Sequence, residues 1–239
     1  MTGRTTTAAG GFDGFPRDAV RYLQDLERHN NRVWFEQHRE DYQRVILEPA
    51  QAFVVATGRL LRRLSSDIYA VPKINASIRR MNRDIRFSRD KRPYKNHLDL
   101  WFWQGSDAGA QHPGYFFRLT AKSLTLGAGM HMFDKPFLER YRDAVLDPRR
   151  GARLQQAMRK ILTGGACELG GQHFKRPPRA IDPSDPRAPL LLHNGLFVGM
   201  TLRPVPAEVF SSAGPAFCFG HFRAMSPLPA WLGDVLVKD

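Results

Sequence analysis

A short segment rich in arginine and lysine, from Arg79 to Lys95, holds the side chains best suited to ligand chemistry. It has eight basic residues and two acidic ones, so it carries +6 of the chain's formal net charge of +13. A guanidinium group binds phosphate or carboxylate through two parallel hydrogen bonds, and a lysine adds a point charge. These residue types therefore predict an anion-binding site. The basic residues are Arg79, Arg80, Arg83, Arg86, Arg89, Lys91, Arg92 and Lys95.

The middle of this segment alternates in a way that fits an extended chain. Successive side chains of an extended chain point to opposite faces. Arg83, Ile85 and Phe87 would then share one face, which we expect to be packed against the protein. The opposite face would be polar, and it would consist of Asp84, Arg86 and Ser88.

A turn is expected over residues 90–93, because the residue before a proline is disfavoured in the helical region. Such a turn would gather several polar side chains around one point, where they could hold a phosphate or carboxylate group. The predicted anion-binding residues are Arg83, Arg86, Ser88, Lys91 and Lys95.

The two acidic residues of the segment, Asp84 and Asp90, leave three interpretations open. They can orient the arginines of an anion site, or neutralise them in an internal network of ion pairs that fixes the loop. They can also serve a hydrolase-type enzyme, as a general base or as ligands for a hard cation such as Mg²⁺. The residue types by themselves do not decide between these roles.

The rest of the chain predicts an α+β fold, with a curved antiparallel sheet on which N-terminal and C-terminal helices pack. Apolar residues spaced three and four apart predict three helices between residues 16 and 66 and two more between 134 and 162. Short aromatic stretches at 97–103, 115–120 and 123–130 predict an antiparallel meander.

In the later part of the chain, the positions of Gly and Pro and of short apolar stretches indicate the local structure. Residues 164–190 are rich in Gly, Pro and Arg, which predicts an irregular excursion, and residues 196–202 are expected to form a strand. Helices are expected within 207–225 and 229–237. We expect residues 1–14 to be a disordered leader and residues 15–239 to form a single domain.

Three groups of residues, together with Tyr42 and Pro49, resemble the motifs of a family of uncharacterised, mostly bacterial proteins, a conserved domain of unknown function. The first is Asn-Asn-x-x-Trp-Phe at residues 30–35, and the second is the long motif at residues 83–95. The third, Phe-Lys-Arg-Pro-Pro, is at 174–178, and it is followed by Arg-Ala where the family pattern leads us to expect a Gly-Tyr pair. The resemblance spans residues 15 to about 237 and implies no known activity. Residues expected to support the central motif are Trp34, Phe35, Tyr94 and His97.

The strongly basic balance, with a pI near 10.3, predicts an anionic partner. A phosphorylated small molecule or nucleotide is the first candidate, and nucleic acid is the alternative. A GC-rich coding bias would also explain the arginine content without any binding role.

Other classes of site have little support in the sequence. The two cysteines and the histidines lack the spacing of a zinc site, and no glycine-rich phosphate loop is complete. We therefore expect no metal and no cofactor. The absence of disulfide spacing and of a long apolar stretch predicts a cytoplasmic protein with no membrane partner.

Overall fold

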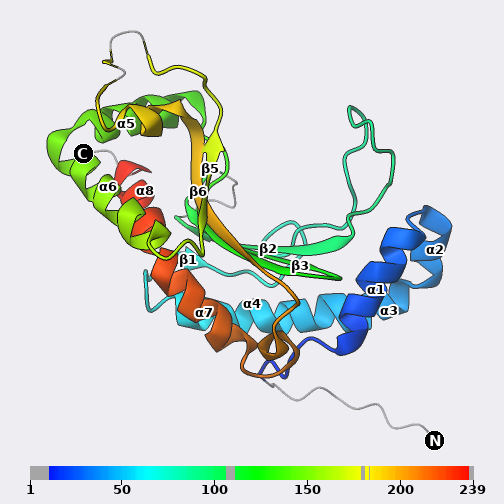
Figure 1. The fold of residues 1–239 in the computed structure, drawn as a ribbon. Coiled ribbons are helices and arrows are strands. Elements are labelled where there is room, and N and C mark those ends of the chain that lie inside the picture. The colour runs from blue at the N-terminus through cyan, green and yellow to red at the C-terminus, as the bar shows by residue number, and fades with distance from the viewer. Residues whose placement is uncertain (1–10, 106–110, 179–180, 183, 237–239) are drawn as a thin grey trace, which may run out of the picture.

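The structure, a computed structural model, describes residues 11–105, 111–178, 181–182 and 184–236, and its centre is an antiparallel sheet of six strands. The strand order is β1-β2-β3-β4-β6-β5, and the sheet bends strongly along its width (Figure 1). The strands are β1 (Ile68–Tyr69), β2 (His97–Gln104), β3 (Gly114–Thr120), β4 (Leu124–Met130), β5 (Glu168–Gln172) and β6 (His193–Leu202).

Alternation along the strands gives the sheet two different faces. In β2, Leu98, Leu100 and Phe102 are buried, whereas Asp99 and Trp101 point to the other face and are only partly covered. Apolar side chains on alternate positions form a core on one side of a sheet. The expected meander is confirmed, because β2, β3 and β4 pair antiparallel in sequence order.

Helices cover the convex face of the bent sheet (Figure 1), and α1, α4, α7 and α8 contact its strands directly. The α+β fold expected from the sequence is confirmed. Within the described residues, no helix has both the length and the apolar character needed to cross a membrane. The helices are α1 (Arg17–Arg28), α2 (Arg32–Gln37), α3 (Arg39–Tyr42), α4 (Glu48–Leu61), α5 (Lys135–Leu146), α6 (Pro148–Leu162), α7 (Gly214–Met225) and α8 (Pro227–Leu236).

Two expectations about local structure were wrong. The stretch 164–190 was expected to be irregular, yet it contributes β5, which pairs with β6 and has a register shift between Gly170 and Gln172. Gly171 adopts a positive φ of 95° at this irregularity, which interrupts the alternation of side chains between the two faces. The strand sequence, Glu-Leu-Gly-Gly-Gln, therefore lacks the alternating apolar pattern by which strands are recognised. The second of the three expected N-terminal helices, which was expected to begin after Asn31 and to run through Tyr42, is also divided. It breaks at His38 and continues through a π-helical turn, η1 (Gln43–Leu47), directly into α4.

The N-terminal boundary of the packed region also differs from the expectation. Residues 1–10 of the expected leader lie outside the described residues. Phe12, however, is only 5% exposed, and its ring contacts those of Phe15 and Phe53. The packed part of the chain therefore begins before residue 15.

The side chain of Asn30 joins the N-terminal helices to the central motif. Its Nδ2 donates to the carbonyl of Tyr94 at 3.0 Å, and its Oδ1 accepts from the N–H of Tyr94, also at 3.0 Å. The Tyr94 ring stacks on Phe35 with centroids 4.1 Å apart, and Asn31 caps α2 by accepting from Trp34. The Asn-Asn-x-x-Trp-Phe motif therefore holds the end of the central motif in place.

Replacing Asn30 with alanine should lower the free energy of unfolding by about 1 to 3 kcal/mol, because both backbone groups of Tyr94 lose their partner in a partly buried place. Urea denaturation measures this change. Asn82→Ala is the matched control, since it makes the same change at an exposed position and should stay within about 0.5 kcal/mol of wild type. Equal effects of the two variants would contradict the role of Asn30.

Candidate anion-binding site

The chain between β1 and β2 returns along the outer edge of β2 and so places two arginines there. Asn75 adopts a positive φ of 66°, a conformation that asparagine tolerates, in the turn that begins this return. Ser77 then accepts from the N–H of Trp101 at 2.8 Å, and Arg79 donates its N–H to the carbonyl of Asp99 at 3.0 Å. Backbone pairing with the sheet therefore positions Arg79, and Arg80 follows it directly in the chain.

The central motif forms a loop with a narrow, hydrogen-bonded base. Arg83 donates its N–H to the carbonyl of Pro93, and Lys95 donates to that of Met81, each at 2.8 Å. The residues between these pairs project away from the sheet (Figure 1). The base of the loop is therefore fixed near β2, while its tip lies in solvent.

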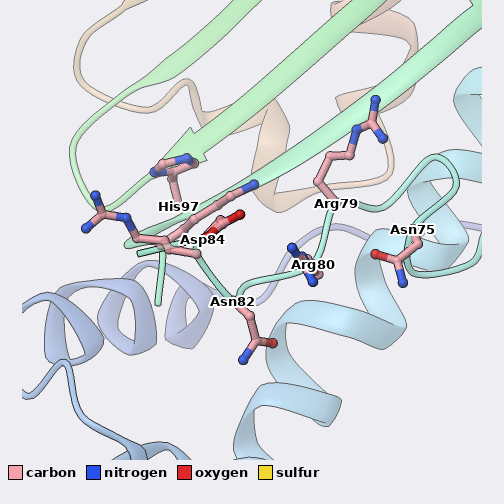
Figure 2. A pocket seen from close by; sticks show the side chains of 8 residues that line it. Asn75, Arg79, Arg80, Asn82, Asp84 and His97 are labelled. Carbon is pink, nitrogen blue, oxygen red and sulfur yellow. The ribbon is translucent and has the colours of Figure 1, made fainter. Parts of the chain in front are cut away.

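A cavity of about 440 Å³ lies between the loop base and the edge of the sheet. Four of its lining residues are cationic and one is acidic. In Figure 2, Arg79 extends its side chain across the neighbouring strand, while Asn82 points toward the helices. The cavity is lined by Asn75, Arg79, Arg80, Asn82, Arg83, Asp84, Lys95 and His97.

Asp99 is the carboxylate on which several of the nearby cations converge. Its oxygens accept from Arg118 Nε at 2.6 Å and lie 3.2 Å from both Lys95 Nζ and His97 Nε2. Burial by itself raises the pKa of Asp99, but the hydrogen bonds from His97 and Arg118 outweigh it and hold that pKa well below its usual range. Asp99 therefore remains ionised and keeps these side chains in place.

The carboxylates of the loop are also paired. Asp90 bonds Arg92 at 2.7 Å and Arg83 at 2.5 Å, and Asp84 bonds Arg86 at 2.6 Å. The hydrogen bonds from Arg92, and then those from Arg83, lower the pKa of Asp90, and the hydrogen bonds from Arg86 lower that of Asp84. A general base works best with a pKa near the working pH, so these carboxylates are suited to orienting arginines rather than to proton transfer.

The expected anion-binding residues do not all meet at one point. Arg83 and Lys95 line the cavity, but Arg86, Ser88 and Lys91 belong to the projecting loop. There Lys91 Nζ donates to the carbonyl of Ile85 at 3.1 Å. The prediction that these side chains gather around one point was therefore wrong, because the hydrogen-bonded base of the loop keeps the tip of the loop away from the sheet.

The packed face expected for residues 83–87 was also wrong. Phe87 is 94% exposed, and Arg86 lies over its ring at 5.8 Å from the centroid. The residues expected to support the motif do so at different places. Tyr94 and Phe35 stack in the core, His97 lines the cavity, and Trp34 stacks on His38 with centroids 4.1 Å apart.

Sequence reasoning did not assign Arg79, Arg80, Asn75 or Asp99 to the site. Arg79 and Arg80 were visible as part of the basic segment, but they precede the recognisable motif. Asp99 had one available signal, since it is an acidic residue within an otherwise aromatic and aliphatic strand. Among the described residues, no group of three or more His, Cys, Asp or Glu side chains is arranged to hold a metal ion.

The fold and site together define an α+β protein with an open antiparallel sheet and a basic cavity at the edge of that sheet. The chain belongs to the family DUF2461, described as a conserved hypothetical protein, whose model matches residues 18–231. This confirms the family resemblance found in the sequence. No curated protein and no solved structure matches the chain.

Replacing Asp99 with asparagine should destabilise the protein by about 2 to 3 kcal/mol near neutral pH, because three cationic or polar partners lose their shared carboxylate. Since the pKa of Asp99 is lowered by folding, its stabilisation is complete above the unfolded pKa of about 3.9 and is lost as the pH falls below it. Urea denaturation from about pH 5.5 down to about pH 3 should therefore show the wild type approaching the variant in stability.

The control for this experiment is Asp25→Asn, which changes an exposed carboxylate whose nearest arginine is 3.6 Å away. Its effect should stay within about 0.5 kcal/mol. A difference between wild type and the Asp99 variant that stays constant throughout the acid range would contradict the ionised role of Asp99.

Proposed function

We propose that this protein binds a small phosphorylated metabolite whose phosphate group occupies the basic cavity. The observation that carries the proposal is the pairing of charges around this cavity. Asp84, Asp90 and Asp99 each have a partner already, whereas the guanidinium groups of Arg79 and Arg80 have no ion pair among the described residues. The cavity therefore retains an uncompensated positive charge.

The chemistry of the lining supports an oxyanion as the ligand. Guanidinium groups present donors in a planar fork that matches phosphate oxygens, and they stay charged at every physiological pH. Arg80 is exposed and Arg79 is partly so, which leaves both free to contact a ligand. The cavity volume of about 440 Å³ also falls within the range of about 300 to 1,000 Å³ that is typical of small-molecule sites.

An internal network of ion pairs explains only part of the basic segment. The pairs of Arg86 with Asp84 and of Arg92 with Asp90 lie on the projecting loop, and their side chains are largely exposed. Exposed pairs of this kind contribute little to stability. They account for Arg86 and Arg92 of the loop but not for Arg79 and Arg80 at the cavity, which have no ion pair among the described residues.

A binding role also fits the acidic residues better than a hydrolytic one. The lowered pKa values of Asp84 and Asp90 make both poor proton acceptors near neutral pH. Their position beside arginines instead allows them to fix the direction of those side chains. We therefore place the function in ligand binding.

Replacing Arg80 or Arg79 with alanine should raise the dissociation constant for ribose 5-phosphate at least about tenfold, since a hydrogen bond to a charged group contributes about 1.5 to 3 kcal/mol. Isothermal titration calorimetry at fixed ionic strength measures the change. Urea denaturation of the Arg80 variant should show little loss of stability, because that side chain is exposed and unpaired.

Arg149→Ala is the matched control, because Arg149 is another exposed arginine without an ion pair among the described residues, and it lies on α6 away from the central motif. It removes the same charge and should leave the affinity nearly unchanged. An equal loss in the control would mean general attraction by the net charge, and the absence of phosphate binding by the wild type would overturn the proposed function.

A further inference from the structure

A second cavity, of about 460 Å³, lies on the concave face of the sheet and shares one residue, Arg79, with the basic cavity. Asp99 also lines it, and two of the partners of Asp99, Lys95 and His97, line the basic cavity. The two cavities therefore adjoin along β2. Apart from Phe117, which is buried, the aromatic and basic residues around the second cavity are Trp101, Phe116, Phe197, His131, Arg79 and Arg118.

The aromatic residues come from different strands that the sheet register brings side by side. Trp101 of β2 lies directly opposite Phe116 of β3, and Phe197 of β6 lies opposite Gly129 of β4. All three side chains are partly exposed, and the ring of His131 is 5.6 Å from that of Phe197. The concave face thus has an aromatic floor.

Two glycines allow rings of this floor to lie across neighbouring strands. A Cβ atom at Gly127 would lie 2.1 Å from Cε1 of Phe116, and one at Gly170 would lie 2.3 Å from Cε2 of Phe197. Each ring therefore rests directly on backbone, at a place where any side chain would push it away. A ring held in this way keeps one face against the sheet and leaves the opposite face available for stacking.

Partly exposed aromatic faces beside cationic side chains are suited to one kind of ligand. Nucleobases are planar and stack on aromatic side chains, and sheets that carry such side chains on an open face are a recurrent way to hold bases. A phosphate attached to the same molecule needs the guanidinium and ammonium groups found next to this floor. A purely aliphatic metabolite would use only the basic cavity.

We propose that the ligand is a free nucleotide, with its base stacked on the floor of Trp101, Phe116 and Phe197 and its phosphate in the basic cavity. This inference rests on the proposed function, and it adds the chemical class of the ligand. Arg79 lines both cavities and lies between the base and the phosphate.

The polar side chains around the floor bear on how selective the site is. Thr125 and His131 offer side-chain hydrogen bonds there, and the Thr125 hydroxyl is 3.0 Å from that of Thr201. Stacking itself tolerates every base, because every base has an aromatic face. Affinities for the four nucleoside monophosphates should therefore lie within about tenfold of one another.

The test compares ligands that differ only in the base. Isothermal titration calorimetry with inorganic phosphate, ribose 5-phosphate and the four nucleoside monophosphates should give affinities about tenfold to a hundredfold higher for the nucleotides than for ribose 5-phosphate. Phe197→Leu and Phe116→Leu should remove most of this gain and leave ribose 5-phosphate binding unchanged. Arg80→Ala should weaken the binding of both.

A second variant keeps the aromatic ring and changes only its position. Gly170→Ala places a methyl group against the Phe197 ring, and the three atoms nearest to the new Cβ all belong to that side chain. The ring can move aside, so the protein should fold while nucleotide affinity falls toward that of ribose 5-phosphate. Circular dichroism and urea denaturation check the fold of each variant.

The outcomes separate the two proposals. Equal affinities for nucleotides and ribose 5-phosphate would overturn the nucleotide inference and leave phosphate binding intact. Failure of every phosphorylated ligand would overturn both. Tight binding of a single-stranded oligonucleotide of about eight residues, with no measurable binding of mononucleotides, would overturn the free nucleotide in favour of a nucleic-acid strand.

Discussion

The carboxylate of Asp99 is the interaction on which the site depends. It lies within β2, where the surrounding protein makes an unpaired charge costly, and it is stable there because Arg118, Lys95 and His97 surround it. These three side chains come from β3, from the end of the central motif and from the start of β2. One partly buried charge therefore joins the open face of the sheet to the basic cavity, and it holds in place cations that would otherwise repel one another.

The remaining arrangement follows from how the charges are distributed around this centre. The aspartates of the projecting loop are paired with arginines of the same loop, and Asp99 is paired with three other residues. Arg79 is held at the sheet edge by its backbone rather than by a carboxylate, since it donates its N–H to the carbonyl of Asp99, and Arg80 follows it directly in the chain. Positive charge is thus left unpaired next to backbone that is hydrogen-bonded to the sheet. An unpaired guanidinium group next to a cavity is suited to the recognition of a phosphate.

The N-terminal helices contribute to this site at a distance. Asn30 pairs with both backbone groups of Tyr94, and the ring of Tyr94 stacks on Phe35. Two motifs whose contacting residues are 64 positions apart in the chain are therefore parts of one contact. On the concave side of the sheet, glycines at positions 127 and 170 have a comparable supporting role, because they let aromatic rings rest on the backbone of the neighbouring strand.

The sequence by itself determined the fold class, the meander, most helices and the basic character of the central segment, because periodicity, caps and charge are local properties. It did not reveal β5, whose glycines and bulge hide the alternation, or the exposure of Phe87. The choice of site residues also needed the tertiary structure. Whether an arginine is free depends on which carboxylate lies beside it in space, and the pairing of Arg118 with Asp99 is made across two strands. Only the tertiary structure therefore distinguishes Arg79 and Arg80, which have no ion pair among the described residues, from the arginines that are paired. It also places the aromatic floor next to Arg79.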